Sequence, residues 1–155
     1  MGIAVSTAGM TFGYAIETTK GTRPTSGYKI VPDVKSVPET QTAPETLENT
    51  PLSNTKNKTY TMGLSDSAGV LEVTANHTEE VEAFWDELVE DFEVAKAEGL
   101  AVWFEIKHPI LSKSTFFTGE PAPFGAGAAE VNSIYETKLY VVMTSETERA
   151  AKSTN

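Results

Sequence analysis

The sequence predicts a mainly β (α+β) fold: a β-sandwich or barrel of about six or seven strands, with one flanking α-helix and one long loop. Three patterns lead to this prediction. Apolar residues alternate with other residues in several short segments, one segment has apolar residues at helical spacing, and one stretch rich in proline and polar residues has neither pattern. The length of 155 residues fits one domain, which we place at 1–145.

The strands are predicted from alternation, because successive side chains of a strand point to opposite faces of a sheet. The first has four alternating apolar residues, and the second is a short edge strand that ends at Pro32. Val102, Phe104 and Ile106 alternate with Ala101 and Trp103, so both faces of that strand should be covered. The segment 131–143 is predicted to be the longest strand. The full set is 10–16, 28–31, 60–62, 70–75, 101–106, 115–118 and 131–143.

A helix is predicted over 78–98. Asn76 or Thr78 can cap its N-terminus, acidic residues follow in the first turn, and Gly99 ends it. One apolar stripe should pack on the sheet, while the opposite face is acidic and solvated. The stripe consists of Val81, Phe84, Trp85, Leu88 and Phe92, and the acidic face of Glu82, Asp86, Glu90 and Glu93.

Residues 36–59 form the predicted long loop. The stretch holds three prolines and many Thr and Asn residues, and Val37, Leu47 and Leu52 are its only sizeable apolar residues. Such a segment cannot bury itself, and long loops inside compact domains are usually functional or ordered by a partner. The polar tail, 146–155, is expected to be frayed.

Charge is concentrated in one part of the chain. Twelve basic and 22 acidic residues give a net charge of −10, and residues 61–100 alone hold 1 basic and 11 acidic residues, which is also −10. No cluster of Lys and Arg exists that would bind a phosphate backbone tightly. A nucleic-acid-binding protein is therefore disfavoured. The chain also lacks an apolar run near the ~18 residues that span a bilayer, and its start lacks a signal-peptide pattern, so we expect no membrane partner.

The residue pattern contains no recognisable active site. The chain has no cysteine, which excludes disulfides, thiolate zinc sites and cysteine nucleophiles. His77 and His108 lie 31 residues apart without a carboxylate at ligand-like spacing. The acidic helix lacks the alternating oxygen ligands of a calcium loop. We therefore expect no catalytic residue, no metal and no cofactor.

The order of several short motifs resembles the major tail tube proteins of long-tailed (siphovirus-type) bacteriophages. The most specific is Ala43-Pro44-Glu45-Thr46-Leu47 with its continuation to Leu52, although Pro51 stands where the family more often has threonine. The resemblance spans about 10–145. The other motifs that carry it are Gly13-Tyr14-Ala15, Gly21-Thr22-Arg23-Pro24, the stretch 30–38, Phe116-Phe117-Thr118-Gly119 and the stretch 127–132.

This resemblance implies a structural virion protein and not an enzyme. Subunits would form six-membered rings that stack into a hollow tube, the conduit for genome delivery. Its partners would be other copies of itself, the tape-measure, tail terminator and distal tail proteins, and DNA only in transit. It would be located in the phage tail, after assembly in the host cytoplasm. Alternatives left open are a tube protein of a contractile or type VI-like secretion apparatus, an adhesion or decoration module, and a small hydrolase.

Two sets of site residues follow from this interpretation. The long loop supplies the subunit interface, and the polar alternate positions of the sheet strands supply candidates for the lumen wall. A wall that lets DNA pass should be neutral to negative, since Lys and Arg drive binding to phosphates. The interface residues are Pro38, Pro44, Glu45, Thr46, Leu47, Leu52, Lys56 and Lys58, and the lumen candidates are Glu72, Glu105, Glu136 and Lys138.

Overall fold

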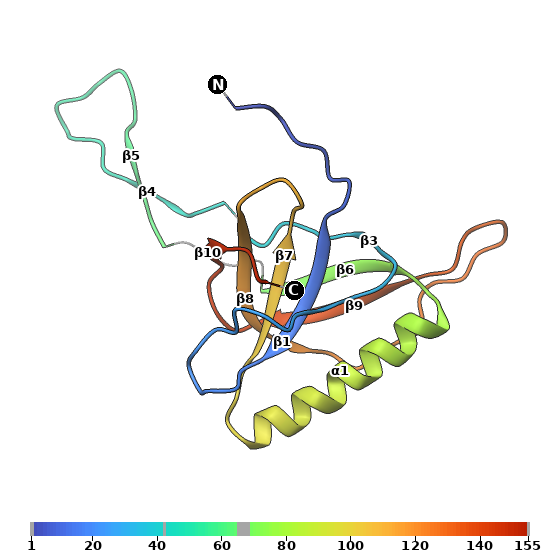
Figure 1. Ribbon diagram of the computed structural model, residues 1–155. Helices are drawn as coiled ribbons and strands as arrows, with labels where there is room; N and C mark the ends of the chain where they lie inside the picture. The colour runs from blue at the N-terminus through green and yellow to red at the C-terminus, as the bar shows by residue number, and fades with distance from the viewer. Residues whose placement is uncertain (1, 42, 65–68, 155) are drawn as a thin grey trace.

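A curled antiparallel sheet forms the body of the protein (Figure 1). The computed structural model describes residues 2–41, 43–64 and 69–154. The strands lie in the order β2-β1-β7-β8-β9-β6-β3, and β10 pairs with β8 beside this path. Their bounds are β1 (Thr11–Ile16), β2 (Lys29–Ile30), β3 (Val34–Ser36), β6 (Val70–Asn76), β7 (Val102–Lys107), β8 (Lys113–Pro121), β9 (Glu136–Met143) and β10 (Glu148–Ala151).

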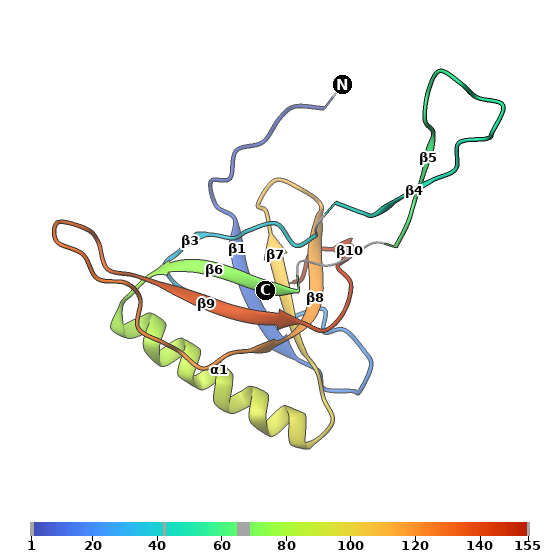
Figure 2. The ribbon, with the colours of Figure 1, turned by 180° about the vertical axis from the view of Figure 1, so that it is seen from behind.

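The single predicted helix is confirmed as α1 (Glu79–Ala97). It begins after Thr78, whose hydroxyl accepts a hydrogen bond from the Val81 N–H at 3.2 Å. Gly99 has φ +75°, a left-handed conformation that glycine adopts without a steric penalty, and it follows the last turn. Figure 2 shows the helix running across one side of the curled sheet.

The predicted apolar stripe of α1 packs into the main core. Val81, Trp85 and Leu88 are buried, and the indole N–H of Trp85 donates a hydrogen bond to the Ala122 carbonyl at 2.7 Å. Phe84 and Phe92 are partly buried against the same cluster. Val31, which follows β2, belongs to the same cluster, and the sheet contributes Phe12, Tyr14, Leu71, Val73, Ala75, Val102, Phe104, Phe117, Leu139, Val141 and Met143.

A second, smaller cluster lies on the other face of the sheet. Ala15, Tyr28 and Phe116 are buried there, with Trp103 and Ala150 packed against them. The expectation that 101–106 is covered on both faces is therefore confirmed, because Val102 and Phe104 belong to the main core and Trp103 to the second cluster.

The expectation of a frayed tail was wrong. β10 pairs with β8 along four residues, and Ser153 is only 6% exposed. The backbone N–H and the hydroxyl of Ser153 both donate hydrogen bonds to the carboxylate of Glu105, at 3.1 and 2.5 Å. Ala150 contributes to the second cluster, so the tail is held by both apolar and polar contacts.

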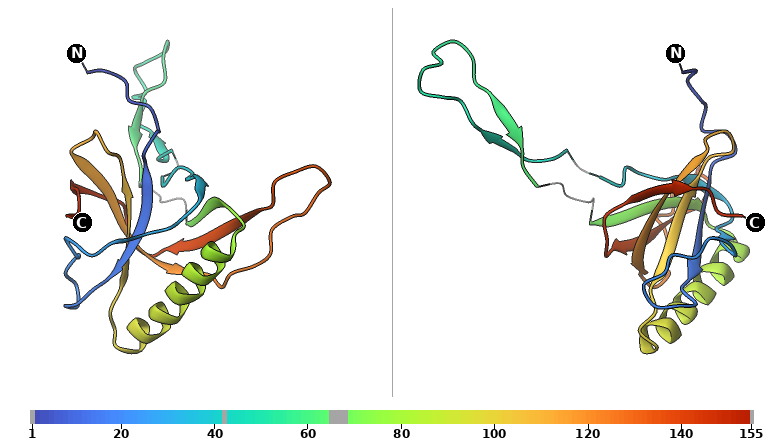
Figure 3. Two further views of the ribbon diagram at one scale, coloured as in Figure 1. Left: turned by 45° about the vertical axis from the view of Figure 1, so that its right-hand side comes forward. Right: turned by 60° about the vertical axis from the view of Figure 1, so that its left-hand side comes forward.

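Two other predictions also need correction. The part of the chain that the structure describes holds ten strands, more than the six or seven expected, because the strands at 34–36, 46–48 and 148–151 lack alternating large apolar residues. The longest strand is β8, with nine residues, whereas β9 begins only at Glu136. Residues 122–135 precede β9 as a loop that stands out from the sheet (Figure 3).

Truncation of Trp85 should test the packing of the helix on the sheet. Trp85 is 1% exposed, so Trp85→Ala removes a fully buried aromatic side chain and should lower the free energy of unfolding by about 3–5 kcal/mol. Val94→Ala changes an exposed position of the same helix and should cost under about 0.5 kcal/mol. Denaturant-induced unfolding measures both, and a Trp85→Ala loss similar to that of Val94→Ala would show that the stripe is not packed.

Candidate assembly surfaces

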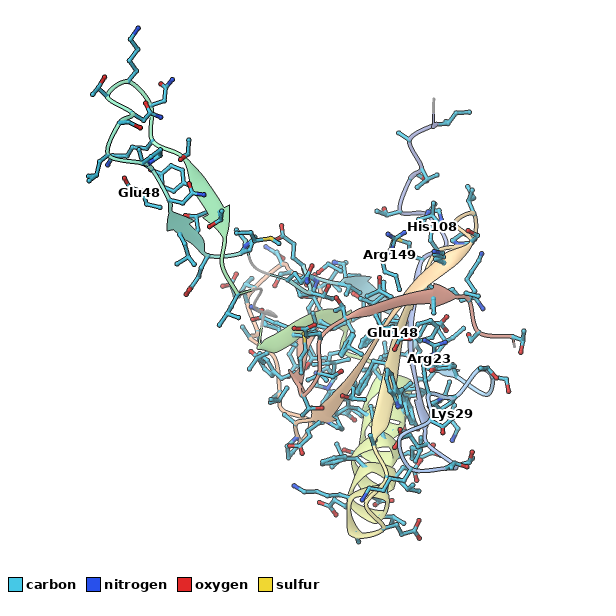
Figure 4. All side chains as sticks on the ribbon, turned by 90° about the vertical axis from the view of Figure 1, so that its left-hand side faces the viewer. Arg23, Lys29, Glu48, His108, Glu148 and Arg149 are labelled. Carbon is cyan, nitrogen blue, oxygen red and sulfur yellow. The ribbon has the colours of Figure 1, made fainter. Side chains whose placement is uncertain are left out.

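A projecting hairpin, residues 45–64, stands away from the body, and we call it the arm (Figure 3). It consists of β4 (Thr46–Glu48) paired with β5 (Tyr60–Met62) and the turn between them, residues 49–59. The prediction of an irregular loop over 36–59 is corrected here, since that range includes β4 and the end of β3. Figure 4 shows Glu48 on the arm, far from the labelled residues of the body.

The arm exposes apolar side chains that its own chain leaves uncovered. Leu52 is fully exposed, and Met62 is 70% exposed. Leu47, Tyr60 and Leu64 are also exposed, and neither buried cluster of the described chain includes an arm residue. A two-stranded hairpin alone is at best marginally stable in water. The arm therefore has the surface expected of a segment that packs against a partner.

Backbone and side-chain hydrogen bonds nevertheless define the shape of the arm. The Asn49 N–H donates to the Thr59 carbonyl at 3.0 Å, and the Thr59 N–H donates to the Thr50 hydroxyl at 2.8 Å. The side-chain oxygen of Asn54 accepts from the N–H groups of Lys56 and Asn57 at 3.2 and 3.3 Å. These hydrogen bonds give the turn one defined conformation within a hairpin that is only marginally stable by itself.

The predicted interface residues fall into two groups. Glu45, Thr46, Leu47, Leu52, Lys56 and Lys58 lie on the arm, and Pro38 and Pro44 lie between β3 and β4; all eight are exposed. The sequence analysis missed the apolar residues of the second half of the arm, Tyr60, Met62 and Leu64. The alternation of Tyr60 and Met62 predicted a strand at 60–62, and it was the only signal in the sequence that could have marked these two residues.

The side chains of β6 and β9 that point away from the core form a surface that we call the open face. It carries three of the four lumen candidates, Glu72, Glu136 and Lys138. Lys138 Nζ lies 2.6 Å from Glu72 Oε1, and Glu136 Oε1 lies 2.6 Å from Lys35 Nζ. The hydrogen bond and the negative charge of Glu72 raise the pKa of Lys138. The charges that these ion pairs place on the face are balanced, and the exposed side chains of Val70, Tyr140 and Val142 lie on the same side of the two strands.

The fourth lumen candidate, Glu105, does not belong to this face. Its side chain is 3% exposed and is covered by the C-terminal segment through the hydrogen bonds from Ser153. The sequence-based assignment of Glu105 to an exposed wall was therefore wrong. The pattern within 101–106 correctly predicted two covered faces, but it did not show that a polar residue would be buried on one of them.

A groove of about 500 Å³ separates the loop 122–135 from the open face. Gly127 makes the close approach of this loop possible, because a β-carbon there would overlap the Glu136 carbonyl oxygen. The Thr137 hydroxyl donates to the Gly125 carbonyl at 3.0 Å and holds the start of the loop. The groove is lined by Thr74, Glu130, Ile134, Glu136, Lys138 and Tyr140, among others.

The two histidines have structural contacts in this fold. His77 stacks on Tyr135 with ring centroids 4.2 Å apart, and its Nε2 lies 2.7 Å from Glu82 Oε1. His108 Nδ1 accepts from the Ile110 N–H at 3.1 Å, so its Nε2–H donates to the Ser6 carbonyl at 2.6 Å. Among the residues that the structure describes, no three His, Asp or Glu side chains gather as a metal ion would require. No helix in this part of the chain is long and apolar enough to cross a membrane.

Comparison with known proteins shows a shared fold at very low sequence identity. No protein-family model and no curated protein sequence matches the chain. A chain in the cryo-EM structure of the baseplate of the anti-feeding prophage, determined with six-fold symmetry, has a similar structure. The TM-score is 0.57 at 8% sequence identity, and the match covers 97% of this chain and 98% of that chain. The likeness therefore concerns the complete fold.

Substitution of Gly127 should test how closely the loop approaches the sheet. Gly127→Ala places a methyl group against the backbone of β9 and should lower the free energy of unfolding by about 1–3 kcal/mol. Gly125→Ala is the matched control, because a β-carbon at that position meets nothing within 4 Å. Equal stability of the two variants in denaturant titrations would contradict this description of the groove.

Proposed function

We propose that this protein is a structural subunit of a phage-type tail, the tube protein itself, and that six copies form a ring that stacks into a tube. The observation that carries the proposal is the arm, whose exposed apolar residues need a partner. The motifs at 43–52 that resemble tail tube proteins lie in and beside the arm. The baseplate chain with a similar fold belongs to a six-fold assembly, which supports the same class of architecture.

In this proposal the arm and the open face have separate roles. The arm, with Pro38 and Pro44 before it, packs on neighbouring subunits. The open face of β6 and β9 supplies the lumen wall, where Glu72 and its partner Lys138 form a paired, non-cationic surface that does not retain DNA. Tape-measure, terminator and distal tail proteins would contact the lumen and the two ends of the tube.

A tube or baseplate subunit of a contractile or secretion-type apparatus is the second candidate. It is favoured by one observation, which is that the similar structure comes from a prophage baseplate. The two candidates share rings and stacking but differ in partners. A contractile apparatus requires a sheath around the tube, so the second candidate predicts binding of a sheath subunit to the outer surface of assembled rings.

Assembly of the purified protein is the direct test. Negative-stain microscopy of concentrated protein should show rings or tubes with six-fold end views. A protein that remains monomeric at every concentration, including conditions of molecular crowding, would contradict a tube function. The Glu93→Lys variant should assemble like the unmodified protein, because Glu93 is exposed on the outer face of α1 and its substitution changes only the charge there.

Hydrogen exchange should locate the segment that assembly orders. The arm has few contacts besides its own short ladder, so its amides should exchange rapidly in the free subunit. In the tube, packing on a neighbour should slow their exchange by at least about tenfold, while β6 and β9 change little. Equal protection of the arm in both states would show that it does not take part in assembly.

A further inference from the structure

The turn of the arm combines positive charge with one fully exposed apolar side chain. Residues 49–59 include Lys56 and Lys58 and no acidic residue. Both lysines are exposed, and neither forms an ion pair with another residue in the described ranges. Leu52 lies in the same turn with its side chain completely in solvent. The turn therefore carries two cations and one exposed leucine within eleven residues.

The groove beneath the loop 122–135 has the complementary chemistry. Ile134 and Tyr140 are exposed and provide apolar surface. Of its lining charges, Glu136 is paired with Lys35, and Lys138 with Glu72. Glu130 is exposed and forms no ion pair within the described part of the chain. The groove thus offers an uncompensated carboxylate next to an apolar wall.

The arm and the loop lie at opposite ends of the molecule. Figure 1 shows the arm at the upper left and the loop at the right, and the view from behind in Figure 2 agrees. A contact between one end of a copy and the other end of the next copy is heterologous. Such contacts generate closed rings or open filaments, not isolated dimers.

We propose that the turn of the arm docks in the groove of a second copy, with Leu52 against Ile134 and with Lys56 and Lys58 facing Glu130. This inference rests on the proposed function and names the surface that receives the arm. The volume of about 500 Å³ suits a few side chains of a turn. The contact also places Glu136 and Lys138, which both line the groove, at a subunit boundary, and it leaves Glu72 as the lumen candidate.

Charge reversal tests the pairing. Glu130→Lys alone, and Lys56→Glu with Lys58→Glu, should each raise the critical concentration for assembly at least about tenfold, because like charges then meet. The triple variant that combines these changes should assemble at a concentration close to that of the unmodified protein. Glu93→Lys has the same change in net charge as Glu130→Lys and should have no effect. Sedimentation of the polymer measures each value, and circular dichroism verifies the fold of these surface variants.

Crosslinking tests the location of the contact independently. Because the chain has no native cysteine, only the introduced cysteines can react. Leu52→Cys and Ile134→Cys proteins, mixed and assembled, should form a crosslinked dimer with a short bismaleimide. Leu52→Cys mixed with Val94→Cys should form none. If tubes form but the first pair does not crosslink and the triple variant is not rescued, the docking site is wrong while the tube function stands. If the unmodified protein forms no assembly at all, both proposals fail.

Discussion

The apolar side chains of the arm are not buried by the described part of the chain that carries them, and the proposed assembly depends on this exposure. Met62 and Leu64 lie on a hairpin of two three-residue strands, which has no core of its own. The body is already closed by α1 on one side and by the C-terminal segment on the other. We therefore propose that another molecule buries the arm.

The body of the protein is organised so that one region of the sheet stays open. Helix α1 covers the inner side through Trp85 and Leu88, and β10 covers the opposite side of β8 through Ala150. The outward side chains of β6 and β9 are left in solvent, where Glu72 and Lys138 pair across the two strands. A stable core and a free, charge-balanced face thus arise from the same alternation of side chains.

The sequence predicted the parts of the fold that have a strong hydrophobic period. The helix is an example, since Val81, Trp85 and Leu88 recur at helical spacing and all three are buried. The segment 148–151 was missed because four residues with no alternation carry no signal. Its position depends on tertiary contacts, among them the hydrogen bonds from Ser153 to a buried carboxylate.

The candidate site was predictable only in part, for a similar reason. Prolines and polar composition predicted that a partner orders the long segment before β5, and this stays a prediction. The pairing of β4 with β5 was missed because it depends on backbone hydrogen bonds that composition does not reveal. The assignment of Glu105 to an exposed wall failed because a distant part of the chain covers it. The groove is formed by a loop and two strands that are separated in the sequence, and Gly127 gave no sign of its close approach to Glu136.

A cryo-EM density map of the assembled protein would show whether another copy of this protein covers the arm. We expect six-fold rings in which each arm lies against a neighbouring subunit, with the part of the open face around Glu72 turned to a lumen of neutral or negative charge. A map in which the arm extends into solvent, or in which Lys and Arg dominate the lumen wall, would contradict this expectation.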